Sequence, residues 1–184
     1  MANLEFITQA KGVNVNTLSI TNCFSDKYDV YKIVGHSAEY IPTDTNVIDL
    51  QMQFIDSGGS VISDAEYDTA RLLMKAESSF DKDRIEGSTY MYGTMVFGNY
   101  DNSGMVNYVF NPNNSSSYTF MQGQGVGGYD ISNNRFRPSK QLGVHKSAEQ
   151  INGIHFKSSS GSLNFTVTIS VYGVKAWVVA VLSK

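Results

Sequence analysis

The sequence predicts an all-β fold, an antiparallel β-sandwich or barrel, and three observations support this class. Tyr, Thr, Val, Ser and Asn are frequent, and these residue types favour strands and turns over helices. The segment 164–175 alternates apolar residues at positions 165, 167, 169 and 171 with Thr and Ser, which is the period-two pattern of a half-buried strand. Short apolar runs separated by turn residues recur along the rest of the chain, as in sandwiches and barrels.

The first third of the chain contains four candidate strands. Two short extended stretches, 4–8 and 13–20, are separated by Lys11-Gly12. The stretch 28–34 has apolar residues on both faces, which is typical of a central strand. The stretch 47–55 alternates regularly between apolar and polar residues. In that stretch we expect Ile48, Leu50, Met52 and Phe54 to point inward, and Asp49, Gln51 and Gln53 to point outward.

The segment 63–78 allows two interpretations. Ser63 and Glu66 form a capping-box pattern, and the apolar residues that follow fit helical spacing. The alternative is a strand around 71–76. Because the flanking segments are rich in β signals, we favour the strand. Its apolar residues on one face would be Leu72, Met74 and Ala76.

Short strands recur beyond residue 90, with turn residues between them. We expect strands over 90–97, 105–110, 118–121, 142–144 and 153–156, and a Gly-rich loop over 123–134. No repeat or linker divides the sequence, so it predicts a single domain over 1–184. A short N-terminal arm over about 1–12 and an apolar C-terminal extension over 176–184 complete the predicted domain.

Charge and composition argue against several classes of protein. The formal net charge of -3 disfavours a nucleic-acid partner, which a basic patch would bind. No apolar run approaches the length of a membrane span, so we expect no membrane insertion. The first residues, MANLEF, have neither the basic nor the apolar region of a signal peptide, so we expect synthesis in a cytoplasm without a cleavable address. Cys23, the single cysteine, is expected to be a small buried residue.

The sequence contains no motif for catalysis, cofactor binding or metal binding. The Gly-rich loop is not followed by a helix pattern, so it does not match a dinucleotide fingerprint. No Gly-x-Ser-x-Gly nucleophile elbow occurs. His36, His145 and His155 are far apart in the sequence, and alternation places His155 on an outward face. We therefore expect no catalytic residue, no cofactor and no metal.

Residues in the loops and at the C-terminal end are the candidates for binding. An exposed tyrosine in a Gly/Asn-rich connection can stack on a sugar or anchor a protein contact, whereas a buried one fills the core, and both interpretations stay open here. The predicted glycan or partner contacts are Tyr100, Tyr129, Asn133 and Asn134. The apolar C-terminal extension would be costly if left in water, so it predicts a subunit interface. The predicted interface residues are Trp177, Val179 and Leu182.

Four stretches occur in this order along the chain: YDVYKIV, LQMQFIDSGGSVIS, NYVFNPNNSSSYTFMQGQG and INGIHFKSSSGSLNFTVTISVYGVK. They contain a Tyr-x-x-Tyr strand at 28–31, a strand closed by an Asp-Ser-Gly-Gly-Ser turn at 54–60, and a closing segment at 154–174. On these motifs, residues 4–175 resemble a family of small proteins from tailed bacteriophages, especially marine ones. Members of that family commonly end near the Tyr-Gly-Val-Lys, whereas this chain continues as AWVVAVLSK.

The resemblance implies a jelly-roll β-sandwich and a virion structural protein, and it brings no catalytic residues. We therefore expect a non-enzymatic protein located in the virion, which packs on other virion proteins as a capsid-decoration, head-fibre or compact tail component. We expect a symmetric homo-oligomer, with a trimer favoured. The alternative is a carbohydrate-binding receptor-recognition module of a tail fibre that reads host-surface glycans. An enzyme such as a glycan depolymerase would require carboxylates clustered in a cleft.

Overall fold

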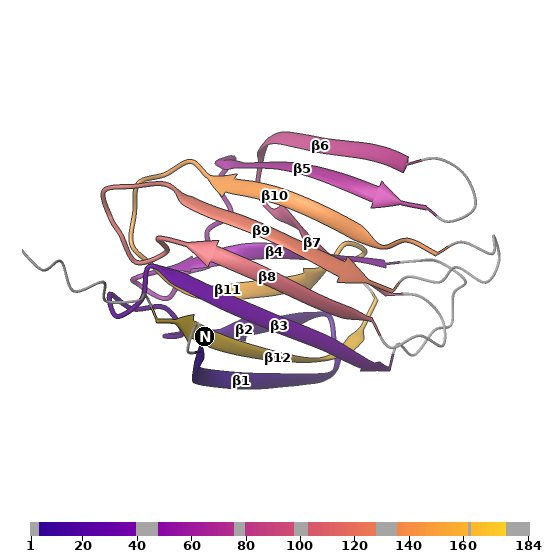
Figure 1. Ribbon diagram of the computed structural model, residues 1–184, viewed down its shortest axis with the longest axis horizontal. Coiled ribbons are helices and arrows are strands. Elements are labelled where there is room, and N and C mark those ends of the chain that lie inside the picture. Colours follow the sequence, from indigo (N-terminus) through magenta and orange to yellow (C-terminus); the bar gives the residue numbers. More distant parts are fainter. Residues whose placement is uncertain are drawn as a thin grey trace, which may run out of the picture.

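The computed structural model describes residues 4–39, 48–75, 80–97, 103–127, 136–161 and 163–175. These residues form twelve strands and no helix, so none of the described elements is a helix that could span a membrane. All the strand pairs are antiparallel, and the strands build one sheet of eight and one of four. The predicted all-β, jelly-roll-like antiparallel sandwich is confirmed (Figure 1).

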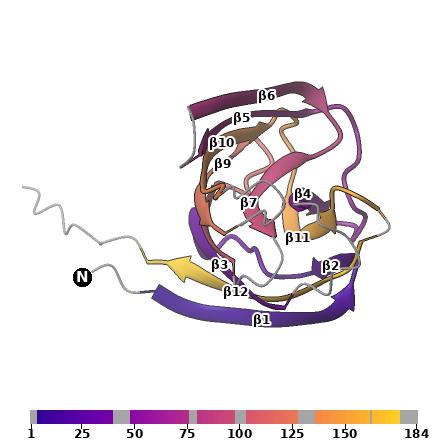
Figure 2. The same cartoon turned by 90° about the vertical axis from the view of Figure 1, so that its right-hand side faces the viewer.

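The two sheets differ in size and wrap one around the other. In spatial order, the eight-stranded sheet contains β1 (Leu4–Val15), β12 (Phe165–Val174), β3 (Val30–Glu39), β8 (Gly104–Phe110), β9 (Thr119–Val126), β10 (Ser139–His145), β5 (Tyr67–Met74) and β6 (Phe80–Ser88). The four-stranded sheet contains β2 (Thr17–Ile20), β11 (Ile151–Ser158), β4 (Ile48–Asp56) and β7 (Met91–Phe97). Figure 2 shows the larger sheet curling around the smaller one. The larger sheet therefore has an inner face on the core and an outer face turned away from it.

The strand predicted over 164–175 is β12, which pairs with β1 on one side and β3 on the other. Its apolar residues enter the core, and Phe165, Val167 and Ile169 are at most 1% exposed. Burying an aliphatic or aromatic side chain of this size stabilises the fold by about 1.5–3 kcal/mol. Cys23 is also buried in this core, as predicted.

A track of small residues on the inner face lets β7 lie very close to the larger sheet. A Cβ atom added at Gly123 would overlap the side chain of Asn107, and one added at Gly125 would overlap the backbone carbonyl of Thr94. The loop predicted over 123–134 is therefore wrong in its first part, because β9 continues to Val126. The glycines allow the strands to pack closely, whereas a run of glycines in a sequence is more typical of a loop.

The N-terminal segment is one long edge strand. The break predicted at Lys11-Gly12 is wrong, because β1 runs without interruption to Val15. Near its end the strand is irregular, because Asn14 has a φ of 54° and the pairing with β12 shifts register between Gly12 and Val15. Residues 4–12, for which the sequence predicts an arm, lie within β1.

Two predictions about which side chains face the core need correction. In β4, Leu50, Met52 and Phe54 point inward as predicted, but Gln53 is buried too. Its amide donates hydrogen bonds to the backbone carbonyls of Ile62 at 3.3 Å and Thr89 at 2.8 Å. These bonds offset the cost of removing the amide from water.

The segment 63–78 contains β5, so the strand interpretation is confirmed. Leu72 and Met74 share a face as predicted, but it is the outer face, and Ala76 lies outside the described residues. Tyr67, Thr69 and Arg71 face the core, whereas Leu72 is 38% exposed. The inward polar groups of two of these residues are paired: the hydroxyl of Tyr67 donates to the carbonyl of Ile62, and the guanidinium of Arg71 forms ion pairs. Pairing of this kind allows polar groups to occupy an inner face that the apolar pattern does not reveal.

Candidate partner-binding face

The outer face of the eight-stranded sheet is lined by rows of side chains that run across the strands. In the central strands β3, β8, β9 and β10, these residues alternate with more deeply buried residues of the inner face. One row contains Phe6, Tyr172, Lys32, Tyr108, Gln122, Leu142, Ala70 and Arg84. A second contains Val34, Val106, Gln124, Lys140, Leu72 and Lys82. A third contains Val30, Phe110, Phe120, Val144 and Asp68.

This outer face exposes large apolar side chains. Leu142 is 58% exposed and Phe120 49% exposed, and Leu72 and Val126 lie on the same face. Single exposed apolar residues are ordinary, but a group of them on one face marks an interaction surface in a soluble protein.

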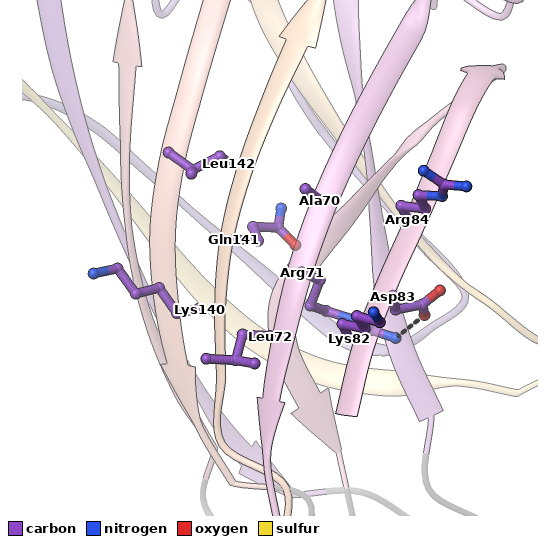
Figure 3. Close-up of a pocket in the computed structure, with 9 residues that line it drawn as sticks. All are labelled: Ala70, Arg71, Leu72, Lys82, Asp83, Arg84, Lys140, Gln141 and Leu142. Carbon is purple, nitrogen blue, oxygen red and sulfur yellow. Dashed lines mark hydrogen bonds and ion pairs between the residues drawn. The ribbon is translucent and has the colours of Figure 1, made fainter. Parts of the chain in front are cut away.

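A hollow of about 630 Å³ lies in this face where β10, β5 and β6 run side by side (Figure 3). Its apolar lining comes from Ala70, Leu72 and Leu142. A second hollow of about 380 Å³ shares Ala70 and Leu142 with the first and extends to Phe120 and Val144. The two hollows together form a shallow apolar depression across four strands.

Besides Arg71, three cations line the first hollow, which we name the cationic hollow: Lys82, Arg84 and Lys140. Within the described residues, none of the three side chains takes part in an ion pair or a hydrogen bond, whereas the nearby carboxylates do. Asp83 is paired with Arg71, and Asp68 accepts a hydrogen bond from Lys146 that holds the pKa of Asp68 below its usual value. The cationic hollow therefore suits an occupant that carries both apolar and anionic groups.

Beneath the cationic hollow, Arg71 ties the two sheets together. Its side chain is only 4% exposed, and its Nη atoms lie 2.7 Å from Asp49 Oδ1 on β4 and 3.0 Å from Asp83 Oδ2 on β6. Its guanidinium carbon lies 3.9 Å from the ring centroid of Tyr92 on β7. Burial, together with the hydrogen bond to Asp83, raises the pKa of Tyr92 to about 12.

This cluster contains residue types that occur in active sites, but its geometry is that of a structural clamp. Asp49 and Asp83 both bond to the guanidinium of Arg71, so each carboxylate is already held by a structural partner. The pKa of Tyr92 moves away from neutrality, which is the wrong direction for a general base. Sequence patterns could not reveal the cluster, because its members come from four strands of two sheets.

The residues predicted from the sequence to bind a glycan, a partner or another subunit all lie outside the described residues. They are Tyr100, Tyr129, Asn133, Asn134, Trp177, Val179 and Leu182. The described strands on either side show which strand ends the segments with Tyr100 and Tyr129 connect. Gly104, at the start of β8, pairs with Val126, and Gly125 pairs with Ser139, at the start of β10. The segments 98–102 and 128–135 therefore connect to neighbouring strand ends.

The three histidines lie on three different strands. His36 is in β3, His145 in β10 and His155 in β11, and among the described residues no group of metal-binding donors contains two of them. His155 points outward, as predicted, and its Nδ1 lies 2.8 Å from the hydroxyl of Ser19. Partial burial lowers the pKa of His155, and Lys157 lowers it further.

Comparisons with known proteins do not assign the chain to a family. No family model matches, and no curated protein matches. Among solved structures, the chain is similar to the alginate lyase A1-II', a member of polysaccharide lyase family 7, with 10% identity over 82% of this chain and 64% of the lyase at a TM-score of 0.27. It is also similar to a fructofuranosidase from Schwanniomyces occidentalis complexed with fructosylnystose, with 9% identity over 92% of this chain and 34% of that enzyme at a TM-score of 0.30. The chain thus spans less than two thirds of either enzyme, and TM-scores this low carry no argument about activity.

Proposed function

We propose that this protein is a non-enzymatic structural subunit of a bacteriophage particle, which packs on a partner virion protein through the outer face of its eight-stranded sheet. The virion context rests on the family resemblance of residues 4–175. The packing role rests on the apolar rows of the outer face, which leave Leu142 and Phe120 in water unless a partner covers them.

The cationic hollow indicates the chemistry of that partner. Lys82, Arg84 and Lys140 surround an apolar floor, so the partner would present carboxylates beside apolar side chains. Such a contact gives both affinity, from apolar burial, and a defined orientation, from the charges. A partner protein fits this pattern better than a neutral glycan, since rings suited to sugar stacking do not line the cationic hollow.

The arrangement of carboxylates supports a non-enzymatic role. A glycan depolymerase of the usual kind needs two free carboxyl groups facing one cleft. Among the described residues that line the cationic hollow, Asp83 is the only carboxylate, and it is bound to Arg71. The enzyme hypothesis is therefore the least supported of the three.

Zero-length cross-linking of purified particles with a carbodiimide tests the proposal. This reagent joins a lysine amine to a carboxylate that already touches it. We expect Lys82 and Lys140 to couple to one partner protein, while Lys11, on the distant edge strand β1, does not couple to it. Absence of the protein from particles, or coupling through Lys11 alone, would overturn the proposal.

The oligomeric state of the subunit is part of the same proposal. We propose a symmetric homo-oligomer, most simply a trimer, in which the apolar extension over 176–184 joins neighbouring subunits. Deleting residues 177–184 is then expected to yield a folded monomer that does not assemble. Light scattering measures the mass of the particle in solution, and circular dichroism checks the fold. A truncated chain that retains the full oligomeric mass would contradict this role for the extension.

A carbohydrate-binding role is the alternative, and one structural observation favours it. The segments that carry Tyr100 and Tyr129 connect to neighbouring strand ends, so their residues start from one end of the sandwich. A glycan could then contact both segments at once. If so, Tyr129→Ala would abolish binding on a glycan array and adsorption to host cells, while assembly would remain intact. Unchanged adsorption of that variant would remove the alternative.

A further inference from the structure

A cluster of metal-ligating side chains lies apart from the outer face. Glu66 precedes β5, His145 ends β10, and Glu149 follows in the connection to β11. Donor atoms of these three residues all lie within 4.8 Å of one another. His145 Nε2 lies 2.9 Å from Glu149 Oε1 and 3.9 Å from Glu66 Oε2. From this geometry we propose that Glu66, His145 and Glu149 form a binding site for a transition-metal dication of the Zn²⁺ type.

The backbone holds the three donors in place. His145 lies opposite Tyr67 on the ladder between β10 and β5, and the neighbouring Lys146 N–H donates to the carbonyl of Glu66 at 2.8 Å. The imidazole is completely buried and packs against the ring of Tyr67, with ring centroids 4.8 Å apart. Its position is therefore fixed by packing before any ion arrives, which lowers the cost of binding.

The two carboxylates give an ion access from solvent. The side chain of Glu66 is 40% exposed and that of Glu149 is 34% exposed. Both can move slightly without disturbing the core, while the buried imidazole stays in place. Three protein donors leave a coordination position for water, as in open zinc sites.

The local charge favours a cation. The carboxylate oxygens of Glu149 and Glu66 both lie near Nε2 of His145, so two carboxylates face one imidazole. The nearest lysine in the chain, Lys146, does not neutralise them, because its Nζ lies 2.9 Å from Asp68. Within the described part of the chain, no lysine or arginine forms an ion pair with either of the two carboxylates that face this imidazole.

The donor set selects the class of metal. Zn²⁺ and related dications accept imidazole nitrogen and carboxylate oxygen together, whereas Ca²⁺ and Mg²⁺ take oxygen ligands. Ligands about 2.1 Å from a tetrahedral ion lie on the order of 3.4 Å apart. On metal binding, the distance from His145 Nε2 to Glu149 Oε1 would therefore increase by about half an ångström, and the distance from Nε2 to Glu66 Oε2 would decrease by about the same amount.

The other nitrogen of His145 provides a second, independent observation. Nδ1 is buried and has no hydrogen-bond partner among the residues that the structure describes, and the same is true of the buried hydroxyl of Thr119, the directly opposite residue on β9. When Nε2 binds a metal, the imidazole proton must sit on Nδ1 and needs an acceptor. Thr119 lies directly opposite His145 on the same face of the sheet, so its hydroxyl, directly or through a water, can serve as that acceptor once a metal is bound.

Titration with Zn²⁺ after removal of metal by a chelator tests this site in the full-length chain. We expect one Zn²⁺ per chain by calorimetry, and a histidine nitrogen spectrum in which Nε2 of His145 shifts and Nδ1 becomes protonated. The variants Glu66→Gln and Glu149→Gln keep side-chain size and are each expected to weaken binding at least about tenfold. The matched control is Glu86→Gln, which changes an exposed carboxylate of β6 and should bind as the native chain does.

Loss of metal binding can be distinguished from loss of folding in each variant. Circular dichroism checks that each variant is folded before titration. Lack of saturable Zn²⁺ binding to the native chain would overturn the proposal, as would equal affinity in all three variants. A shift at His36 or His155, with His145 unchanged, would place the ion elsewhere and would also overturn it.

Discussion

Thr94 on β7 and Asn107 on β8 form a hydrogen bond between the two sheets inside the sandwich. The hydroxyl of Thr94 donates to Oδ1 of Asn107 at 2.9 Å, and both residues are completely buried. The carbonyl of Thr94 accepts a second bond from the hydroxyl of Ser139 at 2.8 Å. Polar contacts between facing sheets require the backbones to approach closely, and Gly123 and Gly125 provide the space.

The first prediction follows from that close approach. In Gly123→Ala, the new methyl group would overlap Oδ1 of Asn107 and break the bond to Thr94. We expect a loss of about 1–3 kcal/mol in the free energy of unfolding, measured by urea denaturation. Gly161→Ala is the control, since no atom lies within 4 Å of its added methyl group. Equal stability of the two variants would contradict the packing argument.

Arg71→Met tests the clamp between the sheets. The substitution leaves Asp49 and Asp83 without their shared cation, and a loss of about 2 kcal/mol in the free energy of unfolding is expected. This value lies below that for fully buried ion pairs, because the two carboxylates are 31% and 38% exposed and stay partly solvated. Arg71→Lys should recover little of the loss, since one ammonium cannot bond to both carboxylates and also stack on Tyr92.

The control for that experiment is Arg84→Met, a substitution of the same kind on the neighbouring strand. Arg84 is exposed and has no partner among the described residues. Its loss should change the free energy of unfolding by no more than about 0.5 kcal/mol. If both methionine variants were equally destabilised, the clamp would not be the cause.

Local patterns predicted the strands well and their faces less well. β12 and β4 were identified because a clean alternation of apolar and polar residues predicts a strand, although Gln53 of β4 is buried against that alternation. The inner face of β5 was missed because Arg71 is buried through partners that lie 22 and 12 positions away in the sequence. The Gly-rich end of β9 was missed because its glycines make room for Asn107 and Thr94, which belong to other strands.

The candidate sites were harder to predict than the fold. The cationic hollow combines Leu72, Arg84 and Lys140, which become neighbours only because β5 lies between β10 and β6. The proposed metal donors Glu66 and His145 meet through the same pairing of β10 with β5. Strand order in an antiparallel sandwich is a property of the whole topology, so a single sequence gives no spacing rule for such sites.

Acid should loosen the edge strand β1 through Glu5. Its carboxylate lies 2.6 Å from Lys27 Nζ and 3.0 Å from Lys175 Nζ. Lys27, with help from Tyr28 and Lys175, lowers the pKa of Glu5 from 4.5 to about 2. Because the pKa in the folded chain lies below that in the unfolded chain, the contact stabilises fully above pH 4.5 and is lost as the pH falls through about 2.

In the variant Glu5→Gln, thermal stability should therefore depend less on pH under acidic conditions. Between about pH 5 and pH 2, the thermal midpoint of the variant is expected to fall less than that of the native chain. Hydrogen exchange in β1 reports the local effect. Glu86→Gln, whose carboxylate forms no ion pair among the described residues, should behave as the native chain does. Identical acid profiles for the native chain and the Glu5 variant would contradict the prediction.

Leu142→Asp separates partner binding from folding on the outer face. Leu142 is 58% exposed, so we expect a change of no more than about 0.5 kcal/mol in the free energy of unfolding. The carboxylate would be buried in an apolar contact once the partner docks, so incorporation into particles should fall sharply. Val13→Asp is the matched control, because Val13 is 61% exposed on the distant edge strand β1. Equal incorporation of both variants would show that the partner does not cover the outer face at Leu142, and equal loss would point to a general effect of a new charge.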